Sequence, residues 1–194
     1  MFFNNKKVIS VLYIFFVLLF VVSCSYNLSK NIINGSFEEV VDNEPSGWVS
    51  NASLSVDNNV YFEVDKNVFH SGSNSILIEL TGGKAPRQEV YKFIRALAQF
   101  ETEKKYKLSG WIKVYKIKNS PYLEAECWNK NKMIGYASTD KIAKVVGNTK
   151  WENVETIFQI PKETTKVLIL LCVPSKNNIY GKVWFDDIQV EKID

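Results

Sequence analysis

Two adjacent carboxylates near the end of the chain are the residues best suited to chemistry. Asp186 and Asp187 interrupt residues 180–190, whose β-branched and aromatic side chains are typical of a strand. Phe185 before the pair and Ile188 after it can face one core only if the backbone slips by one residue. The sequence therefore predicts a β-bulge at the two aspartates.

Like charges side by side are costly unless something neutralises them. The natural partner for a bulged pair of carboxylates is a hard cation, which prefers oxygen ligands. A second oxygen-rich stretch, Asn-Gly-Ser-Phe-Glu-Glu at residues 34–39, lies at the opposite end of the domain. The two stretches predict that a cation clamps the first and last strands together.

These stretches also belong to a series of motifs that resembles one known family. The motifs are Asn34-Gly-Ser-Phe-Glu38, Gly47-Trp48, His70-Ser-Gly72, Tyr106-Lys-Leu-Ser-Gly-Trp-Ile-Lys113, Trp151 with Pro161, and Trp184-Phe-Asp-Asp-Ile188. In this order, over residues 31–194, they resemble carbohydrate-binding modules of the family 4/9 and 22 type. That resemblance implies a galactose-binding-domain-like jelly roll.

The resemblance also assigns roles to individual residues. It implies a structural calcium ion held by Glu38 and by one or both of Asp186 and Asp187, with Asp186 the usual ligand. Backbone carbonyls of residues 34–36 and 70–73 would complete the oxygen shell. The alternative is a pair of solvated acids at a strand edge. The resemblance further implies that Trp48 is structural and that Trp151 is a buried core residue.

Length and charge limit the other classes of function. The chain has 194 residues, and residues 31–194 suit one domain with its own core. Without the leader that carries Lys6 and Lys7, 22 basic residues face 21 acidic ones. This balance is not that of a nucleic-acid-binding protein. The single histidine, His70, excludes a histidine cluster for zinc and is more typical of a turn than of a catalytic base.

The first 23 residues are typical of a lipoprotein signal peptide. Lys6 and Lys7 precede an apolar run from residue 8 to 22 that is interrupted only by Ser10. As a helix the run would reach about 22 Å, short of a hydrocarbon core of about 30 Å. Val-Val-Ser-Cys24 is similar to a bacterial lipobox, in which the cysteine is acylated and becomes the mature N-terminus. An ordinary signal peptide with an incidental cysteine is the alternative.

Acylation of Cys24 would anchor the protein through its N-terminal lipid, because acyl chains contribute about 0.8 kcal/mol per buried CH₂. Residues 24–30 would be a short lipidated tether before the domain. We therefore expect a membrane location in the cell envelope. Ser25 after the cysteine resembles the sorting pattern for the outer membrane in a bacterium that has two membranes.

Alternating apolar residues and turn signals predict an all-β fold. The predicted strands include residues 76–80, 106–115, 122–128, 154–160, 167–173 and 180–190, within a total of eight to ten. The run 167–173 is apolar throughout, as in a strand buried on both faces. The fold class is a single antiparallel β-sandwich, or jelly roll, preceded by the signal peptide. Cys127 and Cys172 are interpreted as two buried free thiols, with a disulfide as the alternative.

One group of side chains combines aromatic rings with carboxylates on strand faces that point away from the core. Because strand residues alternate between faces, these six side chains share a surface if their two strands lie in one sheet. Rings could stack on sugar faces, and the carboxylates could accept hydroxyl hydrogen bonds. The predicted glycan-binding residues are Trp111, Tyr115, Tyr122, Glu124, Glu126 and Trp128.

The sequence thus predicts a non-catalytic, membrane-anchored carbohydrate-binding lipoprotein. The alternative is a structural or interaction β-sandwich with an envelope protein as its partner and no glycan site. Glu124 and Glu126 could in principle supply the acid and base of a glycosidase. Carboxylates on such a face are, however, commonly hydroxyl acceptors, so we do not expect an enzyme.

Overall fold

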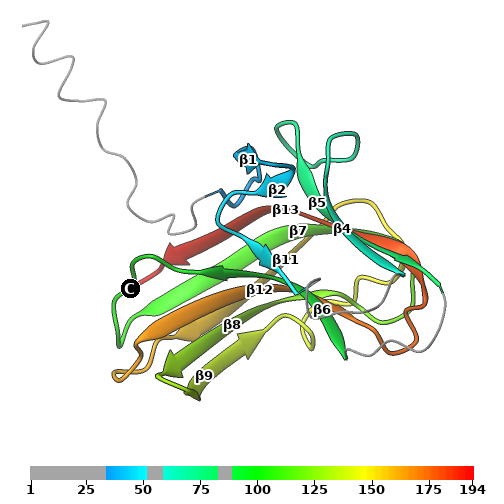
Figure 1. Ribbon diagram of the computed structural model, residues 1–194. Helices are drawn as coiled ribbons and strands as arrows, with labels where there is room; N and C mark the ends of the chain where they lie inside the picture. The colour runs from blue at the N-terminus through cyan, green and yellow to red at the C-terminus, as the bar shows by residue number, and fades with distance from the viewer. Residues whose placement is uncertain (1–33, 52–58, 83–88) are drawn as a thin grey trace, which may run out of the picture.

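The computed structural model describes residues 34–51, 59–82 and 89–194 (Figure 1). The expected signal peptide and tether, residues 1–30, lie outside these ranges. Within them every regular element is a strand, so the predicted all-β class is confirmed. None of the described residues forms a helix long and apolar enough to cross a membrane.

Two antiparallel sheets form the two layers of a sandwich (Figure 1). The six-stranded sheet has the order β10 (Gly147–Asn148), β7 (Lys105–Ile117), β13 (Tyr180–Lys192), β5 (Ser75–Thr81) and β4 (Val60–Asp65), and β11 (Glu152–Gln159) also pairs with β7. The five-stranded sheet has the order β3 (Val49–Ser50), β6 (Val90–Ala96), β12 (Lys166–Pro174), β8 (Tyr122–Asn129) and β9 (Lys132–Ser138). A small separate hairpin pairs β1 (Val40–Val41) with β2 (Glu44–Pro45).

The core lies between the two sheets and follows the alternation of each strand. From Tyr106 to Val114 in β7 and from Val154 to Phe158 in β11 every second residue is buried, while the residues between them are half-buried or exposed. β12 differs, because residues 167–173 include only one that is not buried. Val167, Ile169 and Leu171 belong to the core, whereas Leu170 is buried on the opposite face. The prediction that this strand is buried on both faces is confirmed.

The predicted bulge in the last strand is present. The register of β13 against β7 shifts between Asp186 and Gln189, and Asp187 adopts a positive φ of 49°. Because of this slip, Phe185 and Ile188 both reach the core and are at most 2% exposed. The N–H of Ile188 donates to the Gly35 carbonyl at 2.8 Å, so the start of the domain does lie against the bulge.

The structure also shows how the two cysteines and Trp48 are placed. Cys127 and Cys172 are free and buried, as expected. They cannot bridge because Cys127 faces the core while Cys172 lies on the other side of its sheet. Trp48 is 4% exposed, and its indole N–H donates to the Asn34 carbonyl at 3.1 Å. The structural role predicted for this tryptophan is confirmed.

Candidate functional site

The six residues predicted to bind a glycan do not share one surface. β7, which carries Trp111 and Tyr115, belongs to the six-stranded sheet, whereas β8 belongs to the five-stranded sheet. The premise that the two strands lie in one sheet is therefore wrong. Residue alternation assigns a side chain to the inner or outer face of its strand, but it carries no information about which sheet contains that strand. The residues divide into two sets on opposite outer faces of the sandwich.

Trp111 is covered by the loop that holds the only histidine. The His70 ring stacks on Trp111 with a centroid separation of 3.9 Å and an interplanar angle of 16°. Trp151 meets the same imidazole edge-on at 5.8 Å. The expectation that Trp151 is a core residue is wrong, because its side chain packs with this loop and is half-buried. Tyr115 lies on the same outer face and is 44% exposed.

The two aspartates of the bulge hold this loop through charge-assisted hydrogen bonds. Asp186 is fully buried, and its Oδ2 accepts the backbone N–H groups of His70 at 2.7 Å and Ser71 at 3.2 Å. Its Oδ1 accepts the N–H of Asp187 at 2.7 Å. Burial raises the pKa of Asp186 to about 6, although the backbone N–H groups favour the carboxylate. Asp187 in turn contacts His70 Nδ1 at 2.7 Å and accepts the Ser71 hydroxyl at 2.8 Å.

Glu38 holds the other end of the same loop. Its Oε1 accepts the backbone N–H groups of Ser73 at 2.9 Å and Asn74 at 3.1 Å. The predicted calcium ligands thus all bind loop 70–74. In the described ranges, however, no group of three or more His, Cys, Asp or Glu side chains is placed to hold a metal ion. The carboxylates fit a calcium site only together with backbone carbonyls, and calcium stays a prediction.

The other set of predicted residues lies on the outer face of the five-stranded sheet, which we call the Glu124 face. Tyr122, Glu124, Glu126 and Trp128 alternate with core residues of β8, so they point away from the core. The register adds neighbours from the adjoining strands, in the cross-strand rows Lys92–Cys172–Tyr122, Ile94–Leu170–Glu124–Ser138, Ala96–Leu168–Glu126–Tyr136 and Lys166–Trp128–Met133. One half of this face is apolar, and the other half is aromatic and acidic.

The aromatic half is held in place by polar contacts. The Trp128 indole N–H donates to Glu126 Oε2 at 2.8 Å, and Lys166 Nζ lies 5.4 Å from the indole centroid. Trp128 and Glu126 are half-buried, while Tyr136 is 55% exposed. These contacts fix the indole and one carboxylate before any ligand arrives, which lowers the entropic cost of binding.

Glu124 lies at the centre of the face and is only 6% exposed. Burial, together with a hydrogen bond and the charge of Glu126, raises the pKa of Glu124 to about 7, while Lys92 and Tyr136 act in the opposite direction. The Cys172 thiol lies 3.9 Å from Glu124 Oε2. Near neutral pH this carboxyl group exchanges its proton, so it can serve as either a donor or an acceptor of hydrogen bonds.

The Glu124 face has the components that sugar recognition requires. Rings offer apolar platforms and the two carboxylates offer acceptors. Leu170 and Cys172 of β12, on the same side of the sheet, are themselves buried. The sequence interpretation missed Lys92, Lys166 and Tyr136. Hairpin pairing that starts at Asn129 and Lys132 would place residue 135 opposite Glu126. A bulge at residues 127–128 shifts the register and brings Tyr136 there instead.

Comparisons with known proteins also indicate a carbohydrate-binding domain. A family model described as a carbohydrate binding domain matches residues 29–177. The tRNA nuclease WapA of Bacillus subtilis strain 168 is 27% identical over 172 residues, which are 88% of this chain but 7% of that protein. This chain therefore spans a small part of that relative's length.

Two similar solved structures share the fold. The CBM22-1 xylan-binding domain of Paenibacillus barcinonensis Xyn10C is 16% identical with a TM-score of 0.57, over 86% of this chain and 97% of that one. A cyclase from Fischerella sp. TAU is 14% identical with a TM-score of 0.61, over 86% of this chain and 97% of that one. The same sandwich thus occurs in proteins with different named activities.

The raised pKa of Glu124 predicts a pH-dependent contribution to stability. Between a usual pKa of 4.5 and the folded value of about 7, the native state binds more protons than the unfolded state. Stability from this group therefore falls as pH rises through that window and is constant above it. Glu124→Gln has no such proton to lose, so its free energy of unfolding should not fall in this window. From pH 5 to pH 8 its stability relative to the parent should therefore rise by on the order of 1 kcal/mol, or roughly 2–4 °C in Tm.

Thermal melts of parent and variant at both pH values measure this difference. Glu155→Gln is a matched control, because Glu155 is exposed on β11 in the other sheet. A difference between the Tm of Glu124→Gln and that of the parent that is the same at pH 5 and pH 8 would contradict the prediction.

Proposed function

Because the chain belongs to the carbohydrate-binding domain family, we propose that it binds a glycan on the Glu124 face without catalysing a reaction. The observation that carries the proposal is the cluster of half-buried Tyr122, Glu126 and Trp128 and exposed Tyr136 around the Glu124 carboxyl group. On the opposite sheet, the corresponding tryptophan is already stacked on His70.

The chemistry of the face favours a sugar chain that lies along the sheet. The indole of Trp128 and the ring of Tyr136 are on neighbouring strands, so they can contact the CH-lined faces of sugar rings. Glu124 and Glu126 lie beside them, where their carboxylate oxygens can accept hydrogen bonds from sugar hydroxyl groups. Each such hydrogen bond is worth about 0.5–1.5 kcal/mol net, or somewhat more with a charged acceptor.

A non-catalytic role also agrees with the placement of the acidic groups. Glu124 and Glu126 sit on one open strand face, and Glu126 is held by the indole of Trp128. That hydrogen bond uses Glu126 to orient a ring rather than to transfer a proton. The nuclease and cyclase named above have activities of their own, and neither name assigns an activity to this chain.

Loss of one aromatic platform should weaken glycan binding while the fold remains intact. The core residues among those that the structure describes run from Phe37 to Val190, so protein produced without residues 1–24 keeps all of them. A glycan array with this protein identifies the ligand, and calorimetry then measures affinity. Trp128→Ala should weaken binding by one to two decades, which corresponds to about 1.4–2.8 kcal/mol.

Tyr115→Ala is the matched control, because Tyr115 is exposed on the opposite sheet. It should bind the glycan like the parent, and circular dichroism should show both variants folded. If Tyr115→Ala loses affinity and Trp128→Ala does not, the glycan lies on the six-stranded sheet. If no glycan on the array binds the parent, the interaction β-sandwich with a protein partner becomes the better explanation.

We also propose that a calcium ion stabilises loop 70–74, with Glu38 and Asp186 as the carboxylate ligands and Asp187 at the same bulge. The support is that Glu38 and Asp186 hold the two ends of one loop. Calcium should raise the Tm of chelator-treated protein by several degrees, because it binds only the folded state. Asp186→Asn should abolish that increase, and an equal Tm for the parent in chelator and in calcium would rule the site out.

We propose further that Cys24 carries the lipid that anchors the protein in the cell envelope, in the outer membrane where there are two membranes. The support is the sequence Val-Val-Ser-Cys at the end of the apolar run. Cys24→Ala should abolish incorporation of labelled fatty acid, while Cys172→Ala should incorporate it like the parent. Equal labelling of Cys24→Ala and parent would show that the cysteine is not the acylation site.

A further inference from the structure

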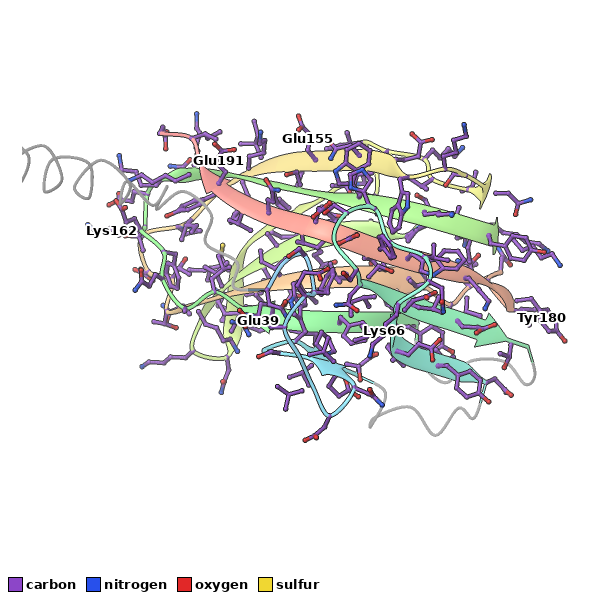
Figure 2. The ribbon with its side chains drawn as sticks, turned by 90° about the horizontal axis from the view of Figure 1, so that it is seen from above. Glu39, Lys66, Glu155, Lys162, Tyr180 and Glu191 are labelled. Atoms are coloured by element: carbon purple, nitrogen blue, oxygen red, sulfur yellow. The ribbon has the colours of Figure 1, made fainter. Side chains whose placement is uncertain are left out.

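Three loops at one end of the sandwich combine exposed lysines with exposed apolar side chains. They connect β7 to β8, β9 to β10, and β12 to β13 (Figure 1). Figure 2 shows Tyr180, at the start of β13, at the end of the molecule opposite Glu191 and Lys162. We call this surface the lysine end. Its exposed basic residues are Lys116, at the end of β7, and the loop residues Lys118, Lys141, Lys144 and Lys176.

Hydrogen bonds join the three loops into one surface. Asn178 Oδ1 accepts the backbone N–H groups of Lys118 at 2.8 Å and Asn119 at 2.9 Å. The Asn119 amide in turn donates to the Lys176 carbonyl at 2.6 Å. Ser120 Oγ accepts the N–H of Val145 at 2.9 Å, which ties in the β9–β10 loop. The lysines are therefore carried on loops whose backbones are fixed relative to one another.

The charge of the lysine end differs from that of the opposite end. The acidic residues in and next to the described parts of its loops are Asp140 and Glu89. None of the five lysines forms an ion pair with another described residue. By the same criterion the other side also has exposed lysines, but four exposed acidic residues lie among them. These lysines are Lys105, Lys130, Lys132, Lys162 and Lys166, and the acidic residues are Glu101, Glu103, Glu163 and Asp194. The lysine end therefore has the larger net positive charge, because fewer acidic residues lie among its lysines.

Apolar side chains are exposed among these lysines. Ile142 is 66% exposed and follows Lys141, while Ile179 at 52% and Tyr180 at 63% follow Lys176 by a few residues. Aliphatic groups at loop tips gain nothing from contact with a soluble polyanion, because they offer it neither charge nor hydrogen bonds. A bilayer covers both kinds of side chain, with phosphates for the lysines and the acyl boundary for the aliphatic groups.

We propose that the lysine end docks onto an anionic lipid surface. The lysines contact headgroup phosphates, and the tips with Ile142 and Ile179 enter the interface between headgroups and acyl chains. This contact is separate from the acylation proposed for Cys24. It also uses none of the aromatic or acidic residues of the Glu124 face, so it does not rest on glycan binding.

Vesicle sedimentation with protein produced without residues 1–24 tests the proposal, because the lipid anchor is then absent. The protein should bind phosphatidylglycerol vesicles at low salt and should not bind phosphatidylcholine vesicles. Each lysine near an anionic surface contributes about 1 kcal/mol, which corresponds to roughly fivefold in partitioning. The double change Lys118→Glu with Lys176→Glu should therefore reduce binding at least tenfold. The matched control, Lys130→Glu with Lys162→Glu, changes the same charge at the opposite end and should bind far better.

The apolar contribution separates a bilayer from a soluble polyanion. Ile142→Ser with Ile179→Ser should reduce vesicle binding severalfold, whereas Ile157→Ser, an exposed isoleucine on β11, should leave it unchanged. Three results would overturn the proposal. The first is equal binding of both vesicle types, and the second is binding of the lysine variants like that of the parent. The third is binding of the parent to a soluble polyuronate that depends on the same lysines but not on the two isoleucines.

Discussion

The hydrogen bonds of the buried Asp186 carboxylate determine how loop 70–74 lies against the six-stranded sheet. A buried carboxylate is costly unless hydrogen bonds satisfy it, and here three backbone N–H groups do so. Two of them belong to His70 and Ser71, so satisfying Asp186 brings the loop against β13. The His70 ring then covers Trp111 on β7. One bulge in the last strand therefore closes part of the outer face of the six-stranded sheet.

Trp111 on that face is engaged by His70, whereas the ring of Tyr136 on the five-stranded sheet is exposed, which is why we propose the ligand there. The central strand of the five-stranded sheet, β12, has apolar residues on both faces, and Leu170 and Cys172 are buried on the side away from the inner core. The acidic and aromatic groups of this face lie on β8 and β9, and Lys92 of β6 and Lys166 of β12 flank them. The resulting face is fixed by neighbouring side chains, as with the indole of Trp128 on Glu126. A preorganised surface of this kind loses little entropy when it binds.

Much of this arrangement was readable from the sequence, and its failures have a common physical cause. Alternation and turn residues predicted the strands and their faces, and the two aspartates predicted the bulge. Sheet membership depends instead on pairing between distant segments, such as β7 with β13 and β8 with β12. The residues around Trp111 and Trp128 in the sequence do not indicate which strands pair with theirs. The same limit explains Tyr136, which a one-residue bulge moved into the site.

The distribution of charge matters more for this protein than its sum. Residues 24–194 have nearly equal numbers of basic and acidic residues, which by itself argues against a strong nucleic-acid footprint. Interactions between exposed charges fade over about 8 Å at physiological ionic strength, so a partner responds to the local patch rather than to the whole molecule. The two ends of the sandwich are farther apart than this, since β13 alone, at thirteen residues, spans roughly 40 Å. A nearly neutral domain can therefore present an acidic, aromatic sheet face and a basic loop end as independent surfaces.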